Sequence, residues 1–227
     1  MIMQSNQNFH GYRISISAID AHPGVRHFSG SNSYQNGSVF ISCPCCNYEM
    51  FPAINLDFSD PKLTTLDLWD PVYMNVLFCP FCGLYMSPYW ICYGNDTIEI
   101  VGGDRSSVEI FQNIETPYLM REITLHEMGP EEDPRVCSKK NDYYMRSLGD
   151  GVYHQIGGFP IKGNANQLSC CKCLKNMAFA GILDYDDLNV PLYENDHIPV
   201  SLIIGDGDCL NFYTCKTCKV IGLSWVR

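Results

Sequence analysis

Short stretches of apolar residues recur along the chain, and their pattern predicts strands rather than long helices. Residues 12–19 alternate apolar and polar side chains with a period of two, as a half-exposed strand does. Apolar runs predict further strands at residues 39–41, 50–58, 73–78, 89–93, 97–101, 122–126, 177–183, 198–204, 210–213 and 220–226. We therefore expect a mainly β protein (α+β with few short helices), with one short helix at residues 139–146.

Polar segments separate these runs and predict loops. Residues 22–37 are rich in Gly, Ser and Asn, and residues 129–134 form an acidic stretch bounded by prolines. Residues 205–208, Gly-Asp-Gly-Asp, predict a hairpin turn. Residues 154–160, His-Gln-Ile-Gly-Gly-Phe-Pro, predict a loop, because two glycines permit a left-handed backbone and proline fixes the exit.

Four Cys-x-x-Cys pairs are the strongest chemical motif, and we call them the first to fourth knuckles in chain order. A turn of this kind points two thiolates at one metal ion, and two such turns complete a tetrahedral site with four cysteine ligands. The sequence predicts two structural Zn2+ ions in zinc-ribbon-like sites, because four thiolates leave no open coordination position. A redox-active Cys-x-x-Cys is the alternative, which the doubling of the pairs disfavours. The predicted ligands are Cys43, Cys46, Cys79 and Cys82 for the first ion, and Cys170, Cys173, Cys215 and Cys218 for the second.

Five of the thirteen cysteines fall outside these pairs: Cys45, Cys92, Cys137, Cys171 and Cys209. Cys45 and Cys171 lie inside the first and third knuckles, where each is an alternative ligand or simply a neighbour. An odd cysteine count and an amino terminus without a signal-peptide pattern favour a reduced, cytoplasmic protein over a disulfide-bonded one.

An internal repeat relates the two halves of the chain. When Cys46 is set against Cys173, residues 50–60 align with residues 177–187 without a gap. The segment from Cys79 to Trp90 also resembles the segment from Cys215 to Trp225, with one residue's difference. We expect two pseudo-symmetric β units related by a pseudo-twofold axis. Residues 1–105 form the first zinc-bearing repeat, 106–149 a connector, and 150–227 the second zinc-bearing repeat.

The net charge of −10 narrows the choice of partners. It argues against nucleic acid and anionic membrane surfaces, which attract positive proteins, and it favours a basic protein partner. The oligomeric state is left open. The chain is 46% hydrophobic, as a globular protein is, yet contains no apolar run of about 18 residues that would span a membrane.

Three further groups have both a structural and a functional interpretation. His154 is a loop histidine or, with a nearby carboxylate, the general base of a hydrolase. Four lysines flank the second site, where they compensate the negative charge of a zinc tetrathiolate centre or form a basic patch: Lys172, Lys175, Lys216 and Lys219. An acidic cluster is a solvated turn or faces a cationic protein: Asp184, Asp186, Asp187, Glu194 and Asp196.

The second half also resembles a known family. Residues 154–160, the third knuckle, residues 177–184 and the Leu-Asn-Phe-Tyr-Thr-Cys stretch at 210–215 are similar to the DUF1963 (YwqG-like) family and to related PDCD2-type zinc-knuckle modules. The resemblance implies a duplicated β-rich fold, no established catalytic residues and a role in protein interaction; some bacterial relatives are regarded as immunity proteins. We expect a non-enzymatic, zinc-stabilised protein that binds a basic toxin domain. A hydrolase and a nucleic-acid-binding zinc protein are the alternatives.

Overall fold

The fold is known from a computed structural model, which describes residues 10–20, 24–29, 41–79, 82, 84, 87–95, 97–105, 121–132, 154–160, 167–184 and 209–226. Within these residues the protein is mainly β, as the sequence predicts, with one short α-helix, α1 (Pro61–Thr64), and a 3-10 turn, η2 (Pro130–Glu132). The predicted helix at 139–146, the predicted strand at 198–204 and the turn at 205–208 lie outside the described residues.

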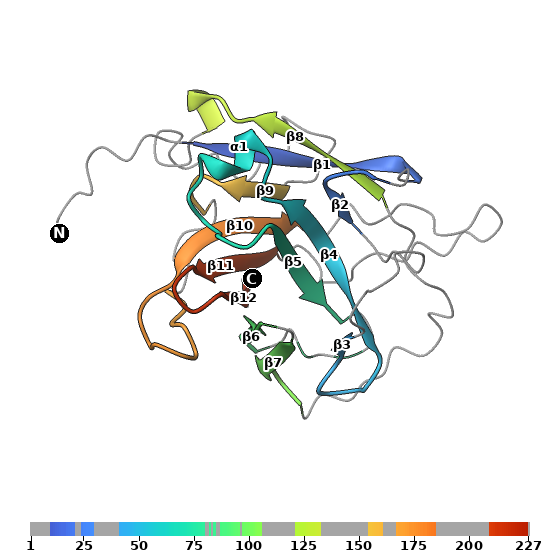
Figure 1. The fold of residues 1–227 in the computed structure, drawn as a ribbon, viewed down its shortest axis with the longest axis vertical. Helices are drawn as coiled ribbons and strands as arrows, with labels where there is room; N and C mark the ends of the chain where they lie inside the picture. The colour runs from blue at the N-terminus through green and yellow to red at the C-terminus, as the bar shows by residue number, and fades with distance from the viewer. Residues whose placement is uncertain are drawn as a thin grey trace.

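Twelve strands make up the described part of the sheet (Figure 1). In chain order they are β1 (Gly11–Asp20), β2 (Phe28–Ser29), β3 (Ile41–Ser42), β4 (Glu49–Asp57), β5 (Tyr73–Phe78), β6 (Tyr89–Tyr93), β7 (Ile98–Gly102), β8 (Arg121–Glu127), β9 (His154–Gly157), β10 (Ala178–Asp184), β11 (Cys209–Cys215) and β12 (Val220–Val226). The apolar runs predicted β5, β6 and β12 with their observed bounds, and the other predicted strands that the structure describes differ at their ends.

Two strands arise where the sequence predicts loops. β2 lies within the predicted loop at residues 22–37, and β9 replaces the first half of the predicted loop at 154–160. Both are short and contain polar residues, so neither shows an apolar period. Each forms because partners pair with it on both sides: β4 and β8 flank β2, and β1 and β10 flank β9.

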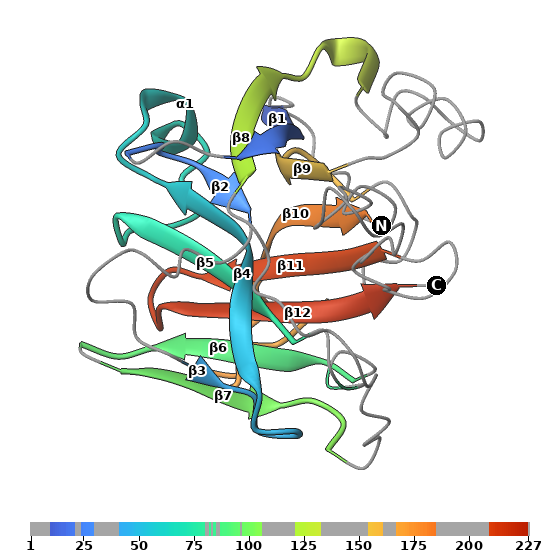
Figure 2. The same cartoon turned by 90° about the vertical axis from the view of Figure 1, so that its right-hand side faces the viewer.

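All strand pairs are antiparallel, in the order β3-β4-β2-β8-β1-β9-β10-β11-β12-β6-β7, with β5 paired to β4. Figure 2 shows how strongly this sheet curls: the β4–β5 hairpin lies across β11 and β12, although several strands separate them in the pairing order. The curl creates two facing layers from one sheet.

The internal repeat is visible in the hairpins β4–β5 and β10–β11. Each hairpin has a register shift at one residue, Ala53 in the first and Ala180 in the second, and the cysteine alignment makes these two residues equivalent. Asn55 pairs with Asn75 on one side of the repeat, and the equivalent Ile182 pairs with Asn211 on the other. The predicted pair of pseudo-symmetric β units is therefore confirmed.

The two copies exchange their leading strands. β1, which precedes the first copy, pairs with β9 of the second, whereas β8, which precedes the second copy, pairs with β2 of the first. β1 and β8 also pair with each other, with Ser15 opposite Thr124 at the centre of the ladder. Ile14 pairs with Leu125 on one side of that centre, and Ile16 with Ile123 on the other. A pseudo-twofold axis therefore passes through this pair. The predicted boundaries of the repeats and the connector stay a prediction.

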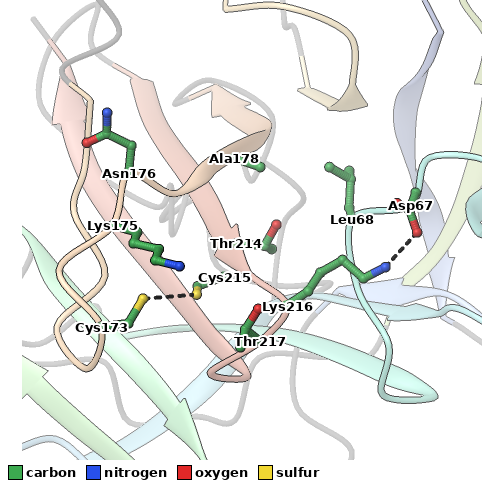
Figure 3. Close-up of a pocket in the computed structure, with 10 residues that line it drawn as sticks. All are labelled: Asp67, Leu68, Cys173, Lys175, Asn176, Ala178, Thr214, Cys215, Lys216 and Thr217. Carbon is green, nitrogen blue, oxygen red and sulfur yellow. Dashed lines mark hydrogen bonds and ion pairs between the residues drawn. The ribbon is translucent and has the colours of Figure 1, made fainter.

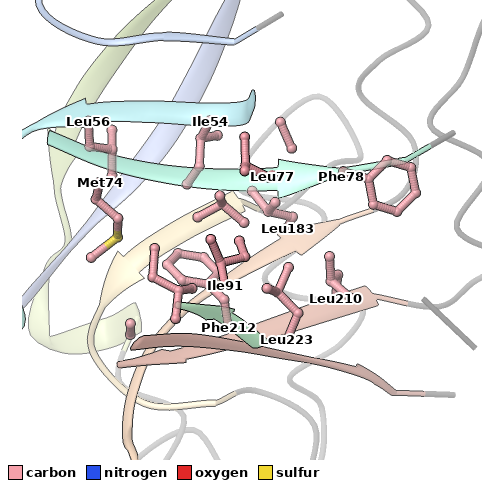
Figure 4. Packing of buried hydrophobic residues seen from close by; sticks show 14 of the residues in the cluster. Ile54, Leu56, Met74, Leu77, Phe78, Ile91, Leu183, Leu210, Phe212 and Leu223 are labelled. Carbon is pink, nitrogen blue, oxygen red and sulfur yellow. The ribbon is translucent and has the colours of Figure 1, made fainter. Parts of the chain in front are cut away.

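The main hydrophobic core fills the space between the two layers (Figure 4). Ile54 and Met74 point down from β4 and β5, and Phe212 and Leu223 point up from β11 and β12 to meet them. All four side chains are fully buried, and each contributes roughly 1.5–3 kcal/mol relative to an exposed position. This core makes the two copies a single packed unit.

Side chains close the outer edge of β5. β6, the strand that follows β5, pairs with β12 of the other copy instead. Three alternate carbonyls on β5 nevertheless have donors: the Tyr89 hydroxyl bonds Leu77 O at 2.8 Å, the Tyr93 hydroxyl bonds Asn75 O at 2.6 Å, and the Trp69 indole bonds Tyr73 O at 3.0 Å. Burial raises the pKa of Tyr89, which keeps its hydroxyl a donor. This edge is thus not open for pairing with another strand.

Candidate metal centres

The first and second knuckles bring four thiols together. The Sγ atoms of Cys43, Cys46, Cys79 and Cys82 all lie within 4.8 Å of one another. The Cys43–Cys82 and Cys46–Cys79 distances are both 3.5 Å. A tetrahedral ion with bonds of about 2.3 Å to sulfur holds its ligand atoms roughly 3.8 Å apart, so the group has the size of a metal site. Cys43, Cys79 and Cys82 are at most 2% exposed and belong to the main core.

The third and fourth knuckles form a second group of the same size. The Sγ atoms of Cys170, Cys173, Cys215 and Cys218 also lie within 4.8 Å of one another, and Cys173 and Cys215 are 3.8 Å apart (Figure 3). Only Cys170 is buried. This group, which packs in a small separate cluster with Leu168, Met177, Tyr213 and Val220, is more open to solvent than the first.

The same backbone turn produces both groups. In the first knuckle the N–H of Asn47 donates to Cys43 O at 2.9 Å, and in the third the N–H of Leu174 donates to Cys170 O at 2.9 Å. The residue after the second cysteine is left-handed in both, with φ of 63° at Asn47 and 61° at Leu174, and likewise 53° at Lys219 in the fourth. This conformation costs a non-glycine residue roughly 1–2 kcal/mol. Leu174 is also 78% exposed, so its own packing does not explain the turn, which instead aims two sulfurs at one point.

Hydrogen bonds favour the thiolate form of one cysteine in each group. A hydrogen bond from the Cys79 thiol lowers the pKa of Cys43 to about 5, whereas burial raises the pKa of Cys82. In the second group the backbone N–H of Lys175 lowers the pKa of Cys173 to about 7. Since a metal binds thiolate and releases protons, each group contains a sulfur that gives up its proton readily.

The two groups contain the eight predicted ligands and neither extra cysteine of the knuckles. Cys45 donates its backbone N–H to Cys43 Sγ at 3.4 Å, but its own sulfur is not part of the group of four. Cys171 Sγ lies 3.4 Å from Cys92 Sγ, on the side of the third knuckle that faces β6. Each group could thus hold one metal ion without either extra cysteine. Cys137 lies outside the described residues.

A pocket of about 290 Å³ adjoins the second group (Figure 3). Lys216 lies at its rim, and its ammonium reaches the carboxylates of Asp67 at 2.5 Å and Asp70 at 3.0 Å. The hydrogen bond to Asp67 raises the pKa of Lys216. The other three lysines beside this group are exposed: Lys172, Lys175 and Lys219.

His154 is part of the sheet rather than of a loop. It lies on β9 opposite Ile14, and its side chain is 3% exposed. The repeat makes it equivalent to His27, a buried residue that the motif search overlooked. The His27 ring accepts the Asp57 N–H at Nδ1 and contacts the Asp60 carboxylate through Nε2, both at 3.1 Å. Extending the alignment upstream of the first knuckle would have found this pair.

Only one member of the predicted acidic cluster lies among the described residues. Asp184 is the last residue of β10, and the rest of the cluster lies outside the described residues. Its first-copy counterparts are Asp57, which accepts hydrogen bonds from Ser59, and Asp60, which caps α1 by accepting the Lys62 N–H at 2.8 Å. In the first copy these carboxylates thus have structural partners.

Among the residues that the structure describes, no helix is both long and apolar enough to span a bilayer. Comparison with family models found no match, and the searches of curated proteins and of solved structures found none either. The resemblance to the DUF1963 and PDCD2-type families therefore stays an expectation.

Proposed function

We propose that the protein is a non-enzymatic binding scaffold that two zinc ions stabilise. Two complete sets of four thiols carry this proposal, since thiolates select soft or borderline ions and a tetrahedral thiolate set is typical of structural Zn2+. A filled coordination sphere has no place for substrate. Eight thiolate ligands also suit a reducing compartment, which favours the cytoplasm.

Metal analysis of the purified protein tests the scaffold. We expect two zinc ions per chain, and one fewer when either Cys79 or Cys215 is replaced by serine. Replacement of Cys45 by serine is the matched control, because it lies in a knuckle but outside the group of four, and it should leave two ions. An unaltered zinc content in both ligand variants would contradict the assignment.

We further propose that the partner is a basic toxin domain, which this protein would neutralise as an immunity protein. The net charge of −10 supports a cationic partner, because complementary charge raises association rate and specificity. Acidic side chains are exposed on β8, at Glu122 and Glu127, and in the loop before β5, where the Asp67 and Asp70 side chains are 86% and 63% exposed.

Co-expression with the toxin gene nearest to its own gene tests this role. We expect rescue of growth and co-purification, with an association rate that falls as salt rises. Glu122→Gln combined with Glu127→Gln should slow association, whereas Lys172→Gln, which removes an exposed charge of the opposite sign, should not. Absence of both rescue and co-purification would count against the immunity role but leave the zinc scaffold untouched.

The exposed lysines of the second site favour one alternative, binding of nucleic acid. Lys172, Lys175 and Lys219 offer three positive charges that no described carboxylate neutralises in an ion pair, although the chain as a whole is acidic. Binding through phosphates weakens steeply with salt. A steep salt dependence that the three Lys→Gln changes abolish would support this alternative over the protein partner.

The hydrolase alternative has less support. A general base has to reach substrate, and the His154 side chain is almost fully buried on a strand paired on both sides. A cellular phenotype for His154→Ala in protein that keeps its fold and its zinc would revive it.

A further inference from the structure

Two of the cysteines outside the metal groups lie in contact with each other. Cys92 Sγ on β6 and Cys171 Sγ in the third knuckle are 3.4 Å apart, although 79 positions separate them in the chain. Cys92 is buried and Cys171 is half-buried, and both belong to the small cluster around the second group. A metal explains sulfur contacts within the groups of four, but these two thiols belong to no such group among the described residues.

Two hydrogen bonds join the segments that carry the two sulfurs. Two residues before Cys92, the Trp90 indole donates to the carbonyl of Ser169, two residues before Cys171, at 3.0 Å. On the other side the Tyr93 N–H donates to Lys219 O in the fourth knuckle at 2.9 Å. Since a disulfide needs a separation of about 2.05 Å, the sulfurs have roughly 1.4 Å to close, a distance that side-chain rotation can cover.

This contact has no counterpart in the first copy. The repeat places Pro44 where the second copy has Cys171, so the first knuckle has no thiol at this position. The pair also connects the two copies, because β6 follows the second knuckle in the chain yet pairs with β12. A bond between these sulfurs would tie the first copy to the third knuckle.

We propose that Cys92 and Cys171 are a modification site, at which a peroxide forms a reversible disulfide. The half-buried Cys171 reacts first: its thiol gives up a proton, the thiolate attacks the peroxide and the O–O bond breaks. The departing hydroxide takes up that proton and leaves as water, and the sulfur becomes a sulfenic acid. The Cys92 thiol then attacks this sulfur, the S–O bond breaks and a second water leaves. The two thiols lose two protons and two electrons in all, and the peroxide is reduced to two waters. An external dithiol reverses the change.

Coordination should make the metal ligands react more slowly. The metal–sulfur bond uses one lone pair of the thiolate and draws charge from the sulfur, which lowers its nucleophilicity, so we expect the uncoordinated pair to react first. The disulfide would therefore form with both metals in place, and it would restrain the turn that carries Cys170 and Cys173. The proposal does not depend on which partner the protein binds.

Mass spectrometry of the zinc-loaded full chain tests the proposal. Hydrogen peroxide is added, free thiols are alkylated, and the digest is searched for linked peptides. We expect a Cys92–Cys171 link with a mass loss of about 2 Da, two retained zinc ions, and complete reversal by dithiothreitol. Cys92→Ser should leave Cys171 as a sulfenic acid that dimedone traps. Cys209→Ser, the control at a cysteine on β11 outside both groups of four, should leave the link unchanged.

Three results would overturn the proposal. Cys92 and Cys171 could stay reduced, and so be alkylated, at every peroxide dose that does not also oxidise the ligand cysteines and release zinc. Cys171 could instead link to a ligand cysteine. Finally, Cys171→Ser could lose one zinc ion, which would make Cys171 a ligand.

Discussion

The first group of four thiols lies inside the main hydrophobic core, whereas the second packs in a smaller cluster and is only partly buried. Their local turns match, down to the left-handed residue after the second cysteine. Duplication thus retained the turn while the surroundings diverged. One Cys-x-x-Cys motif can therefore serve two purposes: to complete a core in the first copy, and to support a charged, solvent-facing surface in the second.

Replacing Cys82 by serine should have the largest effect. Its thiol is fully buried in the core, and the change removes one of the four proposed metal ligands there. Structural zinc contributes about 10–16 kcal/mol in small zinc proteins, which equals or exceeds the total stability of roughly 5–15 kcal/mol of an ordinary domain. We expect no cooperative thermal transition by circular dichroism. Cys45→Ser is the control and should melt like the native protein; a Cys82→Ser variant that does the same would show that the first site is not part of the core's stability.

Replacing Cys218 by serine should have a smaller and local effect. Its group is only partly buried and packs in a cluster of few residues, so the main core should survive the loss of the proposed second metal. We expect one retained zinc ion, a cooperative transition at lower temperature, and faster hydrogen exchange confined to residues 167–177 and 215–220. Global unfolding, as expected for Cys82→Ser, would erase the distinction between the two sites.

Local spacing made both groups predictable. Each Cys-x-x-Cys turn is determined within six residues, so the two groups of four cysteines and the repeated hairpins follow from the sequence. The exchange of β1 and β8, and the departure of β6 from its own copy, depend on pairing between distant segments, and no local period encodes them. The different burial of the two groups depends on which distant residues pack around each of them, and no local pattern predicts it. β2 and β9 were missed for the same reason, since their partners define them.

Replacing Tyr89 by phenylalanine probes how the first copy closes its edge. The Tyr89 hydroxyl bonds Leu77 O on β5 at 2.8 Å in the buried interior. In the second copy the equivalent strand, β11, pairs along its whole length with β12 and needs no such side-chain donor. Loss of the donor leaves a buried carbonyl unpaired, which costs roughly 1–3 kcal/mol. Urea unfolding measures the change. Tyr73→Phe, at an exposed residue of the same edge strand, should cost little; equal effects of the two would mean that the hydroxyl bond does not close the edge.

Replacing Asp60 by asparagine tests whether the Asp60 carboxylate, which caps α1 and contacts His27, stabilises the first copy. Burial alone would raise the pKa of Asp60, but the Lys62 N–H and the His27 ring outweigh it and lower the pKa. A carboxyl whose pKa is lower in the folded state stabilises the fold at pH values above its unfolded pKa of about 3.9, and this stabilisation is lost as pH falls through the folded pKa. The free energy of unfolding of the native protein should therefore exceed that of the variant by about 1 kcal/mol at pH 7, and this difference should disappear below pH 4. Urea midpoints of both proteins between pH 7 and pH 3 measure this, and a difference independent of pH would contradict it.

Replacing Lys216 by glutamine should have the smallest effect. The Lys216 ammonium joins the fourth knuckle of the second copy to Asp67 and Asp70 of the first, yet both carboxylates are mostly exposed. Solvent screens such pairs, and exposed ion pairs contribute about 0–1 kcal/mol. A double-mutant cycle with Asp70→Asn should give a coupling below roughly 0.5 kcal/mol in urea unfolding, and it should vanish in high salt. A coupling above about 1.5 kcal/mol would mean that this contact holds the copies together, as a buried charge pair does. A small coupling leaves the hydrophobic core as the main connection between the copies and leaves the Asp67 and Asp70 carboxylates available to a basic partner.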